Sequence, residues 1–467
     1  AHFNLGNALH ALQDWDGAIK AHQQALNLRP DFVPALTGLG NALRASDQID
    51  SAAQAFRRAI EVDPTYFQAY SNLAITLRAQ GDLVLALEYA KTAFSLNSDS
   101  ADVLSNVGVI YHDLGEIERA RHYYSRALRL QADHADARLG YAMVLLQLSD
   151  YEQGWREYEW RFANNDANPI IRVIPGLERW QGVDSGVVDE LVILHEQGLG
   201  DTLQFIRFAP LLHAYANRVL FACPENLVDL IIESGLVDGV VPIDIDADQL
   251  TPGAQWVPLL SLPGLLSAHE KDFSSSCPYL PLDPDRVFGW NSRLSLERKQ
   301  RSARLIIGLN WQGNPQHEKN VSRGRSLPLE SFAPLADLND VLFLSLQKGY
   351  GSEQLRHCSF RDRFVGFQAE VDAAWDFQDA AALMHCCDLV ISSDTSTAHL
   401  AGAIGAPVWI VLKKVPEWRW GLDRVDTPWY PTARLFRQLR SGDWSAPIDA
   451  MREQLSGVSP GNPSQGA

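Results

Sequence analysis

The chain has 467 residues, of which 46% are hydrophobic and 21% are charged, a composition typical of a soluble globular protein with about three domains. Its 40 basic and 57 acidic residues give a formal net charge of −17, which argues against general nucleic-acid binding through a basic surface. The five cysteines do not suggest a disulfide framework, and no run of 18 apolar residues predicts a membrane span, so we expect a cytoplasmic setting.

The first third of the sequence repeats with a period of 34 residues. Small residues that let antiparallel helices approach closely keep this interval in three columns: Gly6, Gly40, Ala74, Gly108 and Ala142; Ala18, Ala52, Ala86, Ala120 and Gly154; Ala25, Ala59, Ala93 and Ala127. The pattern resembles that of tetratricopeptide repeats and predicts an all-α solenoid over residues 1–162. Its concave surface either binds a protein or peptide, or the array only spaces or dimerises the rest of the chain.

Residues 163–188 are irregular and suit a linker, and strand and helix patterns then alternate. Strands are predicted at residues 191–196, at 218–224 and near Val240, with helices at 202–215 and 225–234. This alternation predicts a parallel sheet. A nicotinamide enzyme is disfavoured, because Leu203 stands where a dinucleotide-binding fingerprint needs its third glycine.

Asp201 follows the first predicted strand of this part, at the start of a helix. Either it caps the helix, or it acts as a base in a space that the neighbouring glycines leave open. Asp244, Asp246 and Asp248 resemble the metal clip of another transferase class, but their place after a weak strand favours a solvated loop.

The last third reads as a second parallel sheet, with strands at residues 305–310, 341–347, 389–391 and 408–412. Arg325 and Lys348 follow two of these strands, and the hydroxyl side chains of Thr395, Ser396 and Thr397 follow a third. Ligands bind at the carboxyl edge of such a sheet, and free backbone N–H groups at a helix start favour an anion, so these groups could bind one diphosphate. Helix capping and solvated surface are the alternatives.

Four aromatic residues near the end either stack on a base or sugar or seal the domain: Trp418, Trp420, Trp429 and Tyr430. The tail over residues 457–467 is rich in Gly, Pro and Ser, and we expect it to be disordered.

Two motifs, GLGDTLQFIRF at residues 198–208 and SDTSTAHLAGAIGAPVW at residues 393–409, resemble the heptosyltransferase-like family of GT-B glycosyltransferases. Joined to the repeats, the arrangement is also similar to protein O-linked N-acetylglucosamine transferases. The resemblance implies a GT-B fold of two Rossmann-like domains with a cleft between them. Residues 163–300 would form the acceptor side and residues 301–456 the nucleotide-sugar donor side.

The resemblance also implies roles for single residues. Asp201 falls on the general base of the heptosyltransferases, and Arg325 stands where that family usually has Lys. Asp394, Thr395 and His399 match a motif near the donor phosphates and sugar, in which Ser396-Thr397 replace a Gly-containing pair.

The sequence therefore predicts an inverting, metal-independent glycosyltransferase that uses a nucleotide-diphospho-sugar as substrate and needs no cofactor. Its acceptor would be a protein hydroxyl recognised by the repeats. The alternative is a repeat scaffold whose sheet domains bind a sugar nucleotide or a partner without turnover.

Overall fold

The computed structural model describes residues 1–163, 173–274, 277–318, 324–374 and 376–457. The chain divides into two compact units, residues 1–145 and residues 146–467. Residues 458–467 of the predicted tail and residues 164–172 of the predicted linker lie outside the described residues. Among the described residues, no helix combines the length and the apolar character that a membrane span requires.

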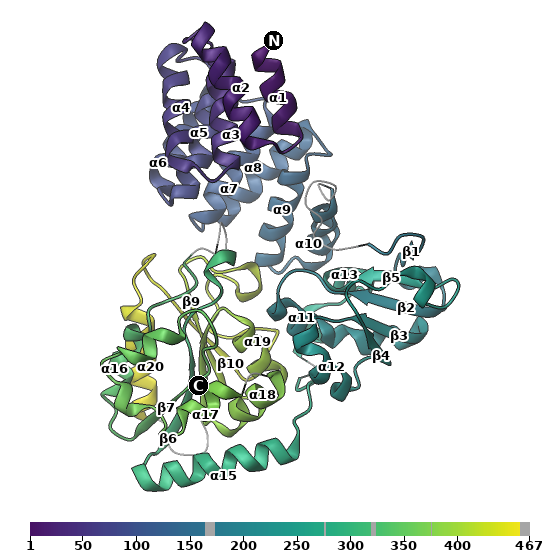
Figure 1. Cartoon of the computed structure of the whole chain (residues 1–467), viewed down its shortest axis with the longest axis vertical. Helices are drawn as coiled ribbons and strands as arrows, with labels where there is room; N and C mark the ends of the chain where they lie inside the picture. Colours follow the sequence, from purple (N-terminus) through teal and green to yellow (C-terminus); the bar gives the residue numbers. More distant parts are fainter. Residues whose placement is uncertain (164–172, 275–276, 319–323, 375, 458–467) are drawn as a thin grey trace. The chain divides into compact units, whose positions relative to one another are not determined.

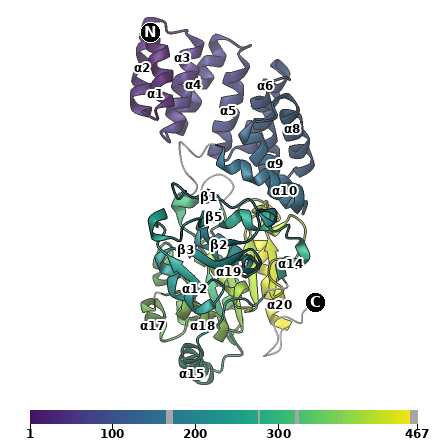
Figure 2. The same cartoon turned by 90° about the vertical axis from the view of Figure 1, so that its right-hand side faces the viewer.

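The first unit consists of antiparallel helix pairs, coloured purple to blue in Figures 1 and 2. The described residues up to 163 contain no strand, which confirms the predicted all-α solenoid. The first helices of successive pairs, α1, α3, α5 and α7, contact one another and so form its inner layer. The helices are α1 (His2–Ala11), α2 (Trp15–Leu28), α3 (Val33–Ala45), α4 (Ile49–Val62), α5 (Phe67–Gln80), α6 (Leu83–Leu96), α7 (Ala101–Asp113), α8 (Ile117–Leu130) and α9 (Ala135–Gln147).

The glycines of the 34-residue period each receive a ring from 16 residues further along the chain. The pairs, with the closest approach of a Cβ built on the glycine, are Gly6 with His22 (2.6 Å), Gly40 with Phe56 (2.5 Å) and Gly108 with Tyr124 (3.0 Å). A side chain at these positions would collide with the ring, so the repeat pattern records how closely the two helices of each pair approach.

The fifth predicted repeat is divided between the two units. Its second helix, α10 (Tyr151–Tyr158), and the 3-10 turn η1 (Glu159–Phe162) belong to the second unit rather than to the solenoid. The ring of Trp155 lies 5.9 Å from that of Phe205, and the ring of Tyr151 lies 4.9 Å from that of Phe273. The first compact unit therefore ends before α10 and η1, whereas the solenoid was predicted to extend to residue 162. The aromatic side chains of α10 pack against residues of the second unit instead.

The second unit holds two parallel five-stranded sheets, which confirms the predicted α/β class. The first has the order β1-β5-β2-β3-β4, and the second the order β10-β9-β8-β6-β7. Their strands are β1 (Glu178–Arg179), β2 (Val188–Leu194), β3 (Ala216–Ala222), β4 (Gly239–Val241), β5 (Gln255–Pro258), β6 (Leu305–Asn310), β7 (Val341–Ser345), β8 (Leu389–Ser393), β9 (Val408–Leu412) and β10 (Ala433–Arg437).

Helices cover both sheets, and the long α15 leads from the first sheet to the second (Figure 1). They are α11 (Leu199–Phe205), α12 (Val228–Ser234), α13 (Leu262–Leu265), α14 (Glu270–Ser274), α15 (Pro284–Arg301), α16 (Ala333–Ala336), α17 (Gln368–Ala373), α18 (Phe377–Cys386), α19 (Ser396–Ala403) and α20 (Ser445–Gly457). The helix predicted over residues 202–215 is α11 followed by a 3-10 segment, Ile206–Ala214, that contains Pro210.

Each sheet reverses its strand order at one point, and these points place the candidate site. In the first sheet, β3 and β4 lie on one side of β2 and β5 lies on the other, so the order reverses between β2 and β5. In the second sheet, β7 lies on one side of β6 and β8 lies on the other, so the order reverses between β6 and β8. Crevices for ligands form outside the carboxyl ends of parallel strands at such reversals. Asp201 follows β2, and the hydroxyl turn at residues 395–397 follows β8, so both stand at these positions.

Candidate functional site

The hydroxyl turn after β8 does not serve to cap helix α19. Thr395 occupies the N-cap position with extended backbone, but its side chain makes no capping hydrogen bond. Its hydroxyl instead donates to the Oδ1 of Asn310 at 2.8 Å, at the end of the neighbouring strand β6. The turn is thereby fixed to the adjacent strand end, while Ser396 and Thr397 form the first turn of α19 and are half-buried.

Lys348 and the hydroxyl turn line the same pocket, which has a volume of about 310 Å³. Polar side chains from the ends of β6 and β7 complete this wall, among them Asn310 and Gln347. Leu199 at the start of α11 and Asn226 come from the first-sheet side of the unit. The structure thus brings Lys348 together with residues 395–397. We call this space the turn pocket.

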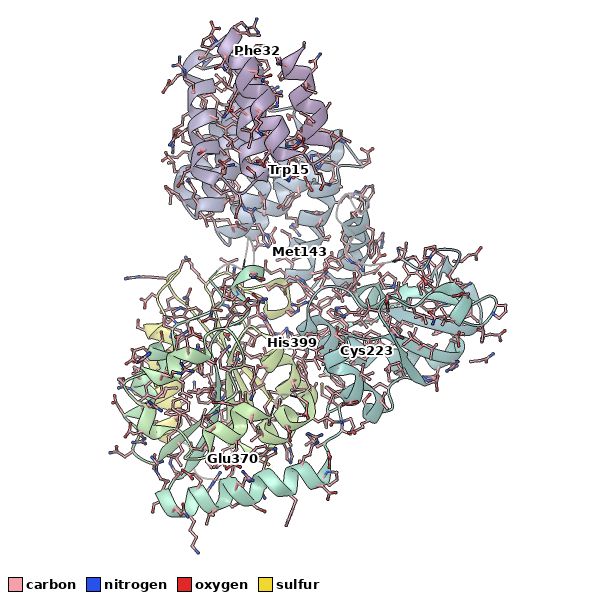
Figure 3. All side chains as sticks on the ribbon, viewed as in Figure 1. Trp15, Phe32, Met143, Cys223, Glu370 and His399 are labelled. Atoms are coloured by element: carbon pink, nitrogen blue, oxygen red, sulfur yellow. The ribbon has the colours of Figure 1, made fainter. Side chains whose placement is uncertain are left out.

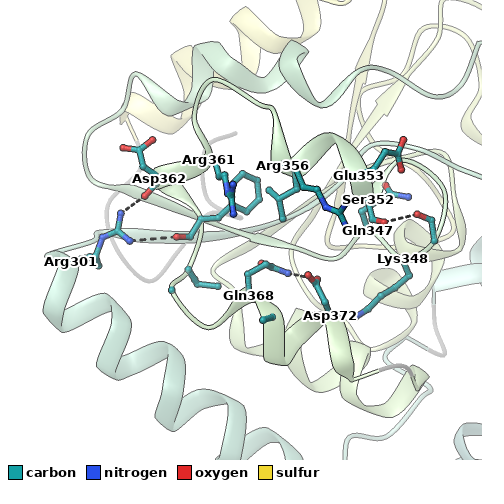
Figure 4. A pocket seen from close by; sticks show the side chains of 16 residues that line it. Arg301, Gln347, Lys348, Ser352, Glu353, Arg356, Arg361, Asp362, Gln368 and Asp372 are labelled. Carbon is teal, nitrogen blue, oxygen red and sulfur yellow. Dashed lines mark hydrogen bonds between the residues drawn. The ribbon is translucent and has the colours of Figure 1, made fainter.

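A second pocket of about 650 Å³ adjoins the turn pocket (Figure 4). The two share Gln347, Lys348 and Gly349. The second is lined by charged side chains of both signs: Arg301, Arg356, Arg361, Glu353, Asp362 and Asp372. We call it the arginine pocket. An elongated ligand could therefore extend from the hydroxyl turn past Lys348 into a larger space that carries charged side chains.

Lys348 is held between the two pockets by the segment after β7. Its ammonium group donates a hydrogen bond to the carbonyl oxygen of Val371. Burial lowers the pKa of Lys348, although the carboxylates of Asp372 and Asp379 act in the opposite direction. A partly desolvated cation in this place interacts strongly with an incoming anion.

Arg325 lines neither pocket. Its guanidinium lies behind Gly313, where a Cβ would approach Nη2 to 2.9 Å, and Gly313 itself lines the turn pocket. The Nε of Arg325 is 3.7 Å from a carboxylate oxygen of Glu318 and, within the described part of the chain, has no hydrogen-bond partner. Arg325 therefore stands one layer behind the pocket wall.

His399 is buried and does not line either pocket. Its Nδ1 is 2.9 Å from the hydroxyl of Tyr430, and its ring stacks on Trp420 at 5.4 Å. Burial, together with the positive charges of Arg419, Arg207 and Arg325, holds the pKa of His399 well below its usual value. Figure 3 shows its place in the unit. A neutral, packed imidazole in this position supports α19 rather than contacting a donor.

The four aromatic residues near the end of the sequence are core residues and not an open platform for a base or sugar. Trp418, Trp420, Trp429 and Tyr430 are all buried, at 0–3% exposure. Trp429 comes from the half of the unit that holds the second sheet, and Phe273 from the half that holds the first. The two rings stack with their centroids 4.0 Å apart, so they pack between the two halves.

Asp201 lies in the first turn of α11 and is bound on both carboxylate oxygens. Oδ2 accepts from the backbone N–H of Gly198 at 3.0 Å, so Asp201 does contribute to capping its helix. Oδ1 accepts from Nη2 of Arg419 at 2.7 Å. Arg419 also lies 3.1 Å from Glu417, which makes a chain of three ionisable side chains.

Burial raises the pKa of Glu417 to about 7, even though Arg419 acts in the opposite direction and Asp394 and Asp201 add to the rise. Sequence reasoning missed Arg419 and Glu417, because it treated the segment around Trp418 as aromatic only. Asp394 is half-buried next to the hydroxyl turn and acts on this cluster through its charge.

The loop before Asp201 is fixed by side chains of α10 and η1. Glu196 is fully buried and accepts from Arg161 at 2.9 Å and from the backbone N–H of Leu260 at 2.6 Å. Gln197, whose φ of 62° is unusual for a residue other than glycine, donates to the hydroxyl of Tyr158 at 2.7 Å. The backbone just before Asp201 is thus fixed on both sides.

The aspartates at residues 244, 246 and 248 are exposed; the first two precede the 3-10 segment Ala247–Gln249, and the third lies within it. Within the described ranges, no group of three or more His, Cys, Asp or Glu side chains is placed to hold a metal ion.

Comparisons with known proteins identify families over two parts of the chain. The model of glycosyltransferase family 9 (heptosyltransferase) matches residues 338–440, which include Lys348 and the hydroxyl turn. Tetratricopeptide repeat models match residues 65–131, and residues 6–47 and 40–81. Protein FlbA of Caulobacter vibrioides is 27% identical over 326 residues, 65% of this chain and 52% of FlbA. The chain thus spans about half the length of that curated relative.

Among solved structures, MamA is 20% identical with a TM-score of 0.29, over 35% of this chain and 95% of that chain. A thermophilic TPR protein of Thermus thermophilus is 24% identical with a TM-score of 0.33, over 36% of this chain and 91% of that chain. The family matches show that this chain carries tetratricopeptide repeats followed by a glycosyltransferase family 9 (heptosyltransferase) domain.

Proposed function

We propose that the chain is an inverting glycosyltransferase that moves a sugar from a nucleotide-diphospho-sugar to an acceptor hydroxyl without a metal ion. The observation on which the proposal rests is the turn pocket, in which Lys348 and the hydroxyls of residues 395–397 line one space at a strand-order reversal. The family 9 match over the same residues supports the same class of reaction.

In this proposal the donor diphosphate lies in the turn pocket. The first-turn N–H groups of α19, the hydroxyls of Ser396 and Thr397, and the ammonium of Lys348 bind its oxygens. The rest of the nucleotide extends into the arginine pocket, whose volume of about 650 Å³ suits a group of that size.

The proposed reaction is a single displacement. Asp201 accepts the proton of the acceptor hydroxyl, whose oxygen forms a bond to the anomeric carbon from the face opposite the diphosphate. The bond between the anomeric carbon and the diphosphate oxygen breaks, and the electron pair stays on the leaving nucleoside diphosphate. Lys348 and the N-terminus of α19 stabilise the negative charge that grows there, which is the part a metal ion has in other transferases. Inversion at the anomeric carbon follows from one displacement.

We further propose that the acceptor is a hydroxyl on a protein that the repeats bind. The support is the solenoid itself, because stacked helix pairs present an extended inner surface of a kind that binds peptides and proteins.

A screen of nucleoside diphosphates by thermal shift tests the donor site, since a ligand that binds only the native state raises Tm. Slow release of nucleoside diphosphate from the matching sugar nucleotide, without acceptor, is then expected. Binding without any such release, with or without candidate acceptors, would favour the scaffold alternative. Turnover should survive EDTA, and activity that EDTA abolishes and manganese restores would contradict the metal-independent proposal.

A further inference from the structure

Arg419 is the residue of the second-sheet half that contacts the proposed base directly. It lies 218 positions from Asp201 in sequence, and its Nη2 donates to Asp201 Oδ1 at 2.7 Å. Its side chain is 9% exposed and that of Asp201 is 16% exposed, so the pair is largely shielded from water. Shielding makes the attraction much stronger than that of a surface ion pair.

The guanidinium is itself held in place by its own segment. Its Nη1 lies 3.1 Å from Glu417 Oε2, and its centre lies 5.0 Å from the ring of Trp418. The carboxylates of Glu417, Asp201 and Asp394 outweigh the effect of burial and raise the pKa of Arg419, so it stays charged. Its Nε is buried and has no hydrogen-bond partner among the described residues.

We infer that Arg419 is a positioning residue for Asp201: it orients the carboxylate across the boundary between the two halves. This inference rests on the proposed function of Asp201 as the base. A carboxylate bound on one oxygen by a backbone N–H and on the other by a rigid guanidinium has one orientation. The same contact ties the base to the half that would hold the donor, so the base is set in place only when both halves are together.

Other titratable groups lie near this pair. Glu417 and Asp394 come from the second-sheet half, His195 precedes Asp201 on its own loop, and Tyr158 comes from α10. Burial lowers the pKa of His195, with Asp201 acting in the opposite direction, and its Nδ1 is 2.8 Å from the hydroxyl of Thr202.

The test is a comparison of kcat and KM for sugar transfer in Arg419→Met and Arg419→Lys. In Arg419→Met, kcat should fall about 10-fold or more because the orientation of Asp201 is lost, while the KM for the donor changes little. Arg419→Lys keeps the charge but cannot bind Asp201 and Glu417 together, so it should also lower kcat.

Arg424→Met is the matched control. Arg424 lies on the same segment and also pairs with a carboxylate of the first-sheet half, Glu270 at 3.0 Å, but it does not touch Asp201. It should leave kcat and KM unchanged. Full kcat in Arg419→Met, a rise in the donor KM in place of a fall in kcat, or full kcat in Arg419→Lys if the Met variant does not fold, would overturn the inference. Full activity in Asp201→Asn would instead show that the proposed base is wrong.

Discussion

Gly200 lies so close to His399 that a Cβ on the glycine would stand 2.9 Å from the histidine Cδ2 and 3.5 Å from the Cα of Ser396. The N-terminal ends of α11 and α19, one from each sheet half, meet at this point. His399 cannot swing away, because Tyr430 and Trp420 hold its ring. The glycine next to Asp201 is therefore required by the close approach of the two halves, in the place where the proposed base and donor site adjoin.

Gly200→Ala should destabilise the chain by about 1–3 kcal/mol, because the added methyl group meets a ring that has no room to move. Gly289→Ala is the control: Gly289 lies within α15 and a Cβ there would meet nothing within 4 Å. That variant should be neutral or more stable by up to about 1 kcal/mol. Chemical denaturation measures both, and equal stability of the two variants would mean that the contact with His399 relaxes freely.

Arg161→Met should be strongly destabilising, by about 3–5 kcal/mol, because it leaves the Glu196 carboxylate buried without its charged partner. Adding Glu196→Gln should recover a part of this loss, since the uncompensated charge is then removed. Arg156→Met is the matched control, because the Arg156–Glu152 pair is exposed, and it should cost less than about 1 kcal/mol. A double variant no more stable than the single one would show that packing of Arg161, not its charge, matters.

Unfolding should also reveal the protonation of Glu417. The pKa of Glu417 is about 7 in the folded chain and 4.5 in the unfolded chain, so the folded chain holds the proton to higher pH. Stability from this group is therefore fully present below pH 4.5, falls as pH rises to about 7, and changes no further above it. The loss is at most about 3 kcal/mol.

Subtracting the stability curve of Glu417→Gln from that of the wild type isolates this contribution, because the amide does not titrate. A flat difference between pH 4.5 and 7 would mean that Glu417 is ionised throughout.

The sequence was most informative where a strand is buried on both faces. The runs at residues 305–310 and 408–412 match β6 and β9 to the residue, since continuous apolar strands flanked by polar turns leave little choice. Strand β10 (Ala433–Arg437) was not predicted, because this short strand at the sheet edge contains Arg434 and Arg437 and shows neither a continuous apolar run nor a strict alternation. Strand β5 (Gln255–Pro258) was missed as well, since it is short and ends in proline.

The site was predictable to the extent that it depends on strand ends. Lys348 and the hydroxyl turn could be placed together, because parallel strands bring their carboxyl ends to one edge. The sequence could not show that Arg325 and His399 lie behind the pocket walls. Arg325 lies there because Gly313 leaves room for it, and His399 because its ring is held by the Tyr430 hydroxyl. The pairing of Asp201 with Arg419 is a contact between distant segments that no local pattern encodes.

Lys348→Ala should weaken the binding of nucleoside diphosphate by about 1.5–3 kcal/mol, the usual contribution of a charged hydrogen bond, and should weaken nucleoside binding far less. Arg325→Ala should have the same sign, and its effect should be smaller because Arg325 lies behind Gly313. Lys299→Ala, on α15, is the control. Calorimetry that finds equal diphosphate affinity in Lys348→Ala and in the control would remove Lys348 from the donor site.

The most direct test of the proposed function is the rate of sugar transfer by Asp201→Asn. The amide keeps the shape of the side chain and, through its oxygen, the hydrogen bond to the Gly198 N–H, but it cannot accept a proton. Its NH2 group then faces the guanidinium of Arg419, so Tm should fall as well. With a donor found in the nucleotide screen and a hydroxyl acceptor, kcat of the folded variant should fall about 100-fold or more, while donor affinity changes little. A kcat close to that of the wild type would contradict the assignment of Asp201 as the general base.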